Sequence, residues 1–130
     1  MPDNSQRSVV LIVDDECIIA DTLALILEQC GYQTKAVYSG ETAVESAMDL
    51  KPDILISDVV MRGMNGIEAA LRIAVVLPEC KIILMSGNAA TADLLQDARA
   101  HGHLFEILAK PLHPQVLIDR LKSFNDVASA

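Results

Sequence analysis

Hydrophobic positions along the chain fall into two alternating patterns. Five short apolar runs are separated by longer segments in which apolar residues recur every three or four positions. The runs are Val9–Val13, Thr34–Val37, Ile54–Ser57, Ile82–Met85 and Phe105–Ala109. Continuous apolar runs of this length are typical of strands that are buried on both faces. The pattern therefore predicts five interior strands.

The segments between the runs have the spacing of amphipathic helices. In the first segment the predicted inner stripe is Ile19, Leu23, Ile26 and Cys30. These positions share one face of a helix, and Gly31 is a typical residue for its end. The later helices are expected at about Glu41–Leu50, from Gly66 to near Pro78, at about Thr91–Ala100, and from Pro114 to about Phe124.

Strand and helix alternate along the whole chain, which favours an α/β protein with a parallel sheet covered by helices on both faces. A length of 130 residues without an evident linker predicts one domain. In a doubly wound sheet of this kind, ligands bind beyond the carboxyl ends of the strands. The residues that follow each strand are therefore the candidates for function.

Composition narrows the class of protein. With 52% hydrophobic and 22% charged residues, the chain suits a folded globular domain, and its net charge of −8 argues against direct binding to nucleic acid.

Three scattered cysteines, Cys17, Cys30 and Cys80, predict buried thiols in a reducing compartment. No apolar run approaches the ~20 residues of a membrane span, and no signal peptide is evident. A cytoplasmic protein without membrane contact is expected.

Polar residues with chemical potential follow four of the predicted strands: Asp14 and Asp15, Asp58, Ser86, and Lys110. Taken singly, such an aspartate is usually a helix cap or a turn residue, the serine a turn hydroxyl, and the lysine a solvated surface residue. If the strand order is 2-1-3-4-5, however, strands one and three are neighbours and the three aspartates converge.

Convergent carboxylates repel one another unless they are protonated or countered by a cation. Oxygen ligands in an open site suit Mg²⁺, and Lys110 supplies a point charge for a phosphoryl oxygen. Together these groups suit phosphoryl transfer in which Asp58 attacks and becomes an aspartyl phosphate. The glycines of "MRGMNG" would let the following loop bring a backbone carbonyl to the metal.

The motifs "LIVDDE", "ISDVVMRGMNG", "ILMSG" and "LAKP" stand in order at successive strand ends. In these motifs the chain resembles the response-regulator receiver domain of two-component signalling, from about Ser8 to Phe124. The resemblance implies a flavodoxin-like, doubly wound, five-stranded parallel sheet of order 2-1-3-4-5 with five helices. It also implies a single receiver domain over residues 1–130, with its core at about 8–124.

The resemblance implies a role for each motif residue at the metal site. Asp58 matches the phosphoacceptor, which also binds Mg²⁺. Asp15 matches the direct metal ligand, and Asp14 matches the acid that holds the metal through water. Val60 matches the position whose backbone carbonyl binds the metal.

Two further residues match groups that contact the phosphoryl group. Ser86 matches the switch hydroxyl, and Lys110 matches the phosphate-contacting lysine. The bond from Lys110 to Pro111 is usually cis in the family, and proline makes such a bond accessible.

The sequence departs from the family pattern at three positions. Arg62 follows Met61 where proline is usual, which predicts a less rigid loop. Val60 is apolar where many relatives are polar, so the dephosphorylation rate stays open. Ile107 replaces the usual aromatic switch residue of strand five, and Phe105 shares its face.

The sequence thus predicts a stand-alone receiver, monomeric or weakly dimeric. It would take a phosphoryl group from a histidine kinase or a histidine phosphotransfer protein and signal to an unknown output partner. It would be no enzyme beyond catalysing its own aspartyl phosphorylation and dephosphorylation. Ile18 and Leu25 are candidates for docking a helical donor, with packing against neighbouring elements as the alternative.

Three other classes of protein were weighed. The first is a phosphorylation-independent interaction module on the same fold, against which the complete acid, hydroxyl and lysine set argues. A flavodoxin-like cofactor binder would need a hydroxyl- or glycine-rich loop after strand one, where "VDDECI" stands instead. A phosphatase with an aspartate nucleophile usually carries a second aspartate two residues on, at the position of Val60.

Overall fold

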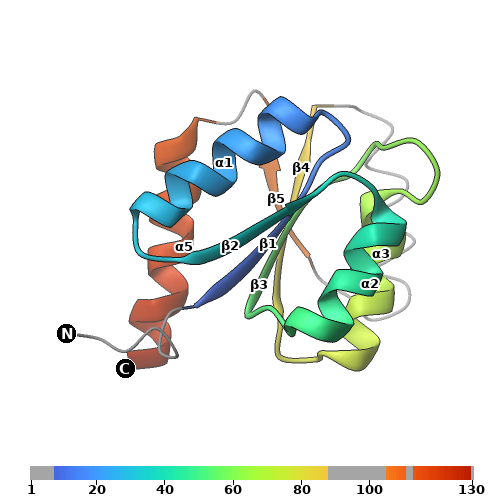
Figure 1. The fold of residues 1–130 in the computed structure, drawn as a ribbon. Helices are drawn as coiled ribbons and strands as arrows, with labels where there is room; N and C mark the ends of the chain where they lie inside the picture. The colour runs from blue at the N-terminus through green and yellow to red at the C-terminus, as the bar shows by residue number, and fades with distance from the viewer. Residues whose placement is uncertain (1–7, 88–104, 111–112, 130) are drawn as a thin grey trace.

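The computed structural model describes residues 8–87, 105–110 and 113–129, with the backbone alone for 125–129. Its centre is a five-stranded parallel sheet of order β2-β1-β3-β4-β5 (Figure 1). The strands are β1 (Val9–Val13), β2 (Gln33–Val37), β3 (Ile54–Asp58), β4 (Lys81–Ser86) and β5 (Glu106–Ala109). Each strand lies within one residue of its predicted bounds. The predicted fold class and strand order are confirmed.

Four helices belong to the described part of the chain: α1 (Cys17–Gln29), α2 (Gly40–Leu50), α3 (Gly66–Val76) and α5 (Pro114–Ser129). The last helix is longer than predicted, because its backbone continues past Phe124. The helix expected at about Thr91–Ala100 lies outside the described residues, and so does Pro111 with its expected cis bond.

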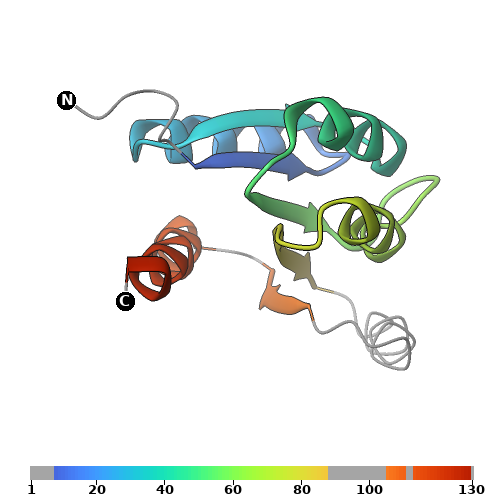
Figure 2. The same cartoon turned by 90° about the horizontal axis from the view of Figure 1, so that it is seen from below.

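The sheet separates two hydrophobic cores, and helices cover both of its faces (Figures 1 and 2). Alternate residues of a strand point to opposite faces, so Leu11 and Val13 of β1 pack toward α2 and α3, whereas Val10 and Ile12 pack toward α1 and α5. The central strand β3 is buried along its whole length. This burial on both faces explains why the central strands read as continuous apolar runs.

Side chains at the helix starts agree with local sequence signals. The Ser39 hydroxyl accepts a hydrogen bond from the Thr42 backbone amide (3.1 Å), and the Asn65 side chain accepts one from the Glu68 amide (2.8 Å). Such caps satisfy amides that have no partner within the helix. The Asn65 cap starts α3 directly behind the loop that follows Asp58, and so fixes where that loop ends.

The predicted inner stripe of α1 is wrong in part. The buried residues are Ala20, Leu23 and Leu27, while Ile19 and Ile26 are only partly buried and Cys30 is exposed. Cys30 is the C-cap of the helix, with φ −89° and ψ 2°, so helical spacing no longer determines where its side chain points. The face that the helix buries is therefore rotated from the predicted one.

The expectation of buried thiols is also wrong for two of the three cysteines. Cys17 and Cys30 are exposed, and Cys80 is half-buried. Burial, assisted by the charge of Asp53, raises the pKa of the Cys80 thiol to about 12. Among the helices of the described residues, none has the length and apolar content that crossing a membrane requires.

Candidate phosphorylation site

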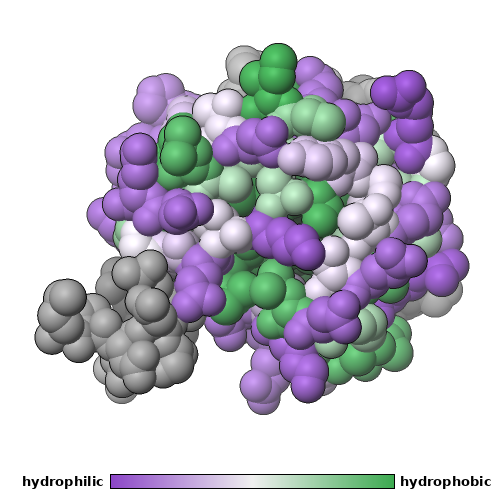
Figure 3. Space-filling model, in the orientation of Figure 1, coloured by the Kyte–Doolittle hydropathy of each residue, from purple (hydrophilic) through white to green (hydrophobic). Residues whose placement is uncertain are grey.

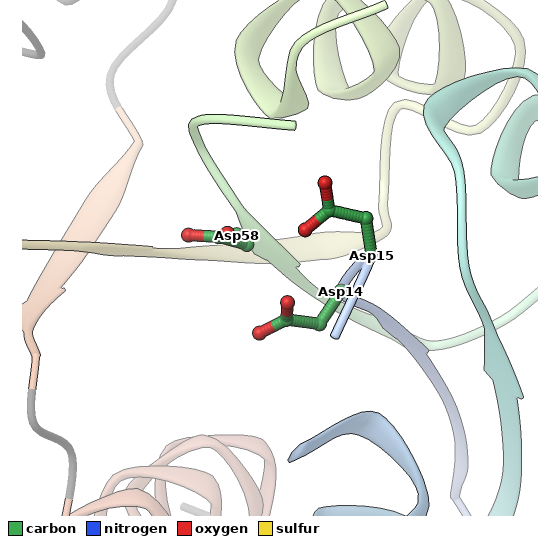
Figure 4. A group of neighbouring side chains, drawn as sticks. All are labelled: Asp14, Asp15 and Asp58. Carbon is green, nitrogen blue, oxygen red and sulfur yellow. The ribbon is translucent and has the colours of Figure 1, made fainter. Parts of the chain in front are cut away.

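Three aspartates meet at the carboxyl ends of two neighbouring strands (Figure 4). Asp14 and Asp15 follow β1, and Asp58 ends β3, which pairs with β1 at Val13 and Ser57. One carboxylate oxygen from each aspartate lies within 4.8 Å of the others. The predicted convergence is therefore confirmed. The cluster forms because the strand order places β1 beside β3.

Burial makes these charges costly. Asp14 is fully buried and Asp58 is 7% exposed, whereas Asp15 is half-buried. Asp14 Oδ1 accepts a hydrogen bond from the Glu16 backbone amide at 3.0 Å. That bond satisfies one oxygen, and the other, Oδ2, accepts a hydrogen bond from Lys110.

Lys110, which follows the edge strand β5, reaches the aspartates at the ends of β1 and β3. Its Nζ lies 3.2 Å from Asp14 Oδ2 and 3.2 Å from Asp58 Oδ1. Lys110 follows the last residue of β5, and its backbone amide donates to the Ser86 carbonyl oxygen at 3.1 Å. One ammonium group thus makes charge-assisted contacts with two carboxylates that come from different strands.

The charges alter one another's protonation. Burial raises the pKa of Asp58, and Asp14 and Asp15 raise it further, against the opposing effect of Lys110. Burial alone would lower the pKa of Lys110, but Asp58 and Asp14 outweigh it and raise that pKa above its ordinary value. The lysine therefore stays cationic, and the site keeps a positive charge next to the Asp58 carboxylate.

Close backbone packing holds the loop after Asp58. Val59 is buried, and its amide donates to the Met85 carbonyl oxygen at 3.0 Å, while its own carbonyl accepts from the Gly66 amide at 2.8 Å. A side-chain carbon at Gly66 would overlap the Asp58 carbonyl oxygen. Glycine at this position is thus required by the close approach of α3 to Asp58.

Two carboxylates hold the outer part of the same loop, which is where the sequence departs from the Met-Pro pattern. The Arg62 backbone amide donates to Asp15 Oδ2 at 3.3 Å, and the Arg62 Nε lies 3.9 Å from the same oxygen. The Met64 amide donates to Glu41 Oε2 at 3.4 Å. The role of Glu41 was missed, because no local signal links a helix start with a loop 23 residues later.

The other predicted residues lie at the end of β4, in the loop after β3, and on or just before β5. Ser86 ends β4, one position beyond the residue that pairs with Asp58. Val60, two residues after Asp58, is 50% exposed. Ile107 and Phe105 both pack against the core on the α2 and α3 side, so the expectation that they share a face is confirmed. An aliphatic side chain therefore stands in the strand β5 position of the usual aromatic switch.

Comparison with known proteins agrees with this geometry. Residues 10–122 match the family described as the response regulator receiver domain. The chain belongs to this family, whose members act in two-component phosphorelays and are not conventional enzymes. The Asp14, Asp15 and Asp58 cluster is consistent with phosphoaspartate signalling, and it is typical of a receiver Mg²⁺ site.

Individual relatives cover the chain to different extents. It is 34% identical over 113 residues to the chemotaxis protein CheY of Thermotoga maritima, covering 86% of this chain and 92% of that protein. It is 25% identical over 120 residues to the DNA-binding response regulator MtrA of Mycobacterium tuberculosis, covering 92% of this chain but only 51% of MtrA. The structure of chemotaxis protein CheY4 from Vibrio cholerae superposes with a TM-score of 0.80 at 26% identity, covering 90% of this chain and 98% of that one.

The donor atoms fit a hard divalent cation. All three clustered side chains offer carboxylate oxygens, which Mg²⁺ prefers, and the partly exposed Asp15 leaves room for water ligands. The triad as a whole carries more negative charge than Lys110 alone can neutralise. An additional cation is therefore electrostatically favoured at this place.

Proposed function

We propose that this receiver accepts a phosphoryl group on Asp58 from a histidine phosphodonor, with Mg²⁺ bound, and so switches its binding to an output partner. The observation that carries the proposal is the position of Lys110 Nζ, 3.2 Å from both Asp58 and Asp14 in a cluster of carboxylates. Neutral packing has no need of such a group, whereas transfer of an anionic phosphoryl group does.

Each residue has a distinct task in the reaction. An Asp58 oxygen forms a bond to phosphorus while the P–N bond to the donor histidine breaks, and the leaving imidazole takes a proton. Lys110 would contact a phosphoryl oxygen in place of its present contact with the Asp58 carboxylate. The hydroxyl of Ser86, at the end of β4, would donate a hydrogen bond to a second phosphoryl oxygen.

Metal binding would involve Asp15, Asp58 and the Val60 backbone carbonyl, with Asp14 acting through water. When bound, the ion screens the attacking carboxylate from the incoming anion. Gly66, the first residue of α3, supports this arrangement, because without a side chain it lets the start of the helix lie against the Asp58 carbonyl.

A direct test is intact-mass spectrometry after incubation with a small phosphodonor and Mg²⁺. One added phosphoryl group is expected, and it should vanish in Asp58→Asn and on chelation of the metal. Asp49→Asn, an exposed aspartate on α2, is the matched control and should label normally. Unchanged labelling of Asp58→Asn would refute the assignment, and no labelling of the wild type would favour the phosphorylation-independent module.

The first helix supports the choice of a protein donor. Ile18 is 82% exposed and Leu25 58% exposed, and α1 begins directly behind the aspartates of the site. Figure 3 shows apolar side chains among hydrophilic ones over the region where α1 lies in Figure 1. Exposed apolar side chains beside an active site suit a helical partner that brings its histidine to Asp58.

Donor docking can be separated from chemistry. Leu25→Ser should slow phosphotransfer from a protein donor while labelling by a small donor stays normal. Val75→Ser, which alters a 77% exposed side chain on α3, is the matched control and should affect neither reaction. Equal slowing of both donors by Leu25→Ser would reject the docking role of α1.

A further inference from the structure

Arg62 places a positive charge against one carboxylate of the site. Its Nε lies 3.9 Å from Asp15 Oδ2, and its backbone amide donates to the same oxygen at 3.3 Å. The Arg62 side chain is 94% exposed, whereas that of Asp15 is only 24% exposed. An exposed cation is thus in contact with a carboxylate of the proposed metal site.

The backbone part of this contact depends on the residue type at position 62. Proline, usual here in the family, has no amide hydrogen and could not donate to Asp15. The bond joins the loop after β1 to the loop after β3 across 47 positions of sequence. The departure from the family pattern therefore adds a link between the two loops that form the site.

The two basic residues divide the three carboxylates between them. Lys110 contacts Asp14 and Asp58, and Arg62 contacts Asp15. A divalent ion that binds Asp15 directly would compete with Arg62 for the Asp15 carboxylate, and it would also be repelled by the nearby guanidinium.

We propose that Arg62 is a positioning residue that acts as an internal counter-ion to Asp15 and thereby lowers the affinity of the site for Mg²⁺. Metal binding displaces the Arg62 side chain from Asp15, so that occupancy of the site is coupled to the conformation of the loop after β3. This inference rests on the metal site of the proposed function, and it concerns how tightly that site binds.

The exposure of Arg62 bears on how strongly this residue should change the affinity of the site for Mg²⁺. As a stabilising ion pair the contact is worth little, because water screens a charge that is 94% exposed. The guanidinium charge should have a larger effect on a nearby Mg²⁺, because that ion carries two charges. Removing the guanidinium should tighten Mg²⁺ binding by about three- to tenfold at low ionic strength.

Three variants separate the charge from other effects. Arg62→Gln removes the charge but keeps the backbone amide, and Arg62→Lys keeps a positive charge. Arg72→Gln is the matched control, because it makes the same change of net charge at an exposed arginine of α3 that pairs with Glu68.

The decisive measurement is a calorimetric titration of each full-length variant with Mg²⁺. Arg62→Gln should bind about three- to tenfold more tightly than the wild type, with the difference shrinking as salt is added. Arg62→Lys and Arg72→Gln should stay within twofold of the wild type. Equal affinities for Arg62→Gln and Arg72→Gln would overturn the proposal.

Thermal unfolding supplies a second readout that needs no phosphorylation. Without metal, Arg62→Gln should melt close to the wild type, because water screens the exposed arginine and its ion pair contributes little to stability. With saturating Mg²⁺ its melting temperature should rise more than that of the wild type. A wild type that binds no Mg²⁺ would refute the metal site and this inference together. If the wild type binds Mg²⁺ and Arg62→Gln binds it with the same affinity, the inference alone is refuted.

Discussion

The two ends of β3 carry the same residue type in opposite roles. Asp53, just before the strand, accepts a hydrogen bond from the Val9 backbone amide at 2.8 Å, and its own amide donates to the Val9 carbonyl at 2.8 Å. Asp58, at the other end, faces two carboxylates and one lysine. Asp53 is exposed and tied to the backbone, whereas Asp58 is buried among charges. A carboxylate becomes reactive through its neighbours, not through its own type.

The remaining surroundings extend this contrast. Near Asp53 lies a hollow of about 300 Å³, lined by Lys51, Pro52, Asp53, Val76, Leu77, Pro78, Glu79 and Cys80. Burial raises the pKa of the Cys80 thiol to about 12, so this thiol is not nucleophilic at neutral pH. The amino end of the sheet holds the fold together locally, while the carboxyl end carries unfavourable charges that the fold tolerates.

Gly66→Ala should have the largest effect on stability, because its new methyl group would overlap the Asp58 carbonyl oxygen. We expect a loss of about 3 kcal/mol in the free energy of unfolding, together with slower phosphorylation. Gly31→Ala is the control: it has φ +101° but open space around it, and should cost only about 1 kcal/mol. Urea denaturation measures both variants, and equal losses would contradict the argument from close approach.

Lys110→Met should come next, because it leaves fully buried Asp14 without its cation. A loss of about 2 kcal/mol is expected in the absence of metal. Lys81→Met changes an exposed lysine at the amino end of β4 and should change stability by less than about 0.5 kcal/mol. Similar losses for the two variants, measured by denaturation in chelator, would show that the carboxyl end is not electrostatically special.

The raised pKa of Asp58 makes stability depend on pH at this end of the sheet. The folded protein holds the Asp58 proton to a higher pH than the unfolded chain does, so unfolding releases a proton in that window. The metal-free wild type should therefore lose stability relative to Asp58→Asn as pH rises from the ordinary carboxyl range of about 4. Denaturation curves at several pH values measure this difference. A difference of the opposite sign would mean that Lys110 lowers the pKa more than burial raises it.

The smallest effect is expected at the amino end. Lys51 has φ +50°, a left-handed conformation that costs a residue with a side chain free energy. Lys51→Gly should stabilise the fold by about 0.5–1 kcal/mol and leave phosphorylation unchanged. Lys51→Ala retains the side-chain carbon and should bring no such gain. A gain of equal size in both would attribute the effect to the charge.

Much of the site could be predicted because its parts are marked locally. A buried strand of a parallel sheet reads as an apolar run, and the first polar residue after it marks the carboxyl end. Asp14, Asp15, Asp58, Ser86 and Lys110 were predicted in this way, and the structure brings the three aspartates and Lys110 together. Their convergence followed from the strand order alone, since β1 and β3 had to be neighbours for the aspartates to meet.

What the sequence by itself determined, then, is the alternation of elements, the ends of the strands and the charged residues that follow them. Only the tertiary structure decided which face of α1 is buried, because that helix carries apolar residues on several sides, including the exposed Ile18 and Leu25. Only the tertiary structure, too, brought Arg62 to Asp15 and Glu41 to Met64. These contacts join segments that are far apart in the chain. Local periodicity carries no information about them, because they exist only after the strands have paired.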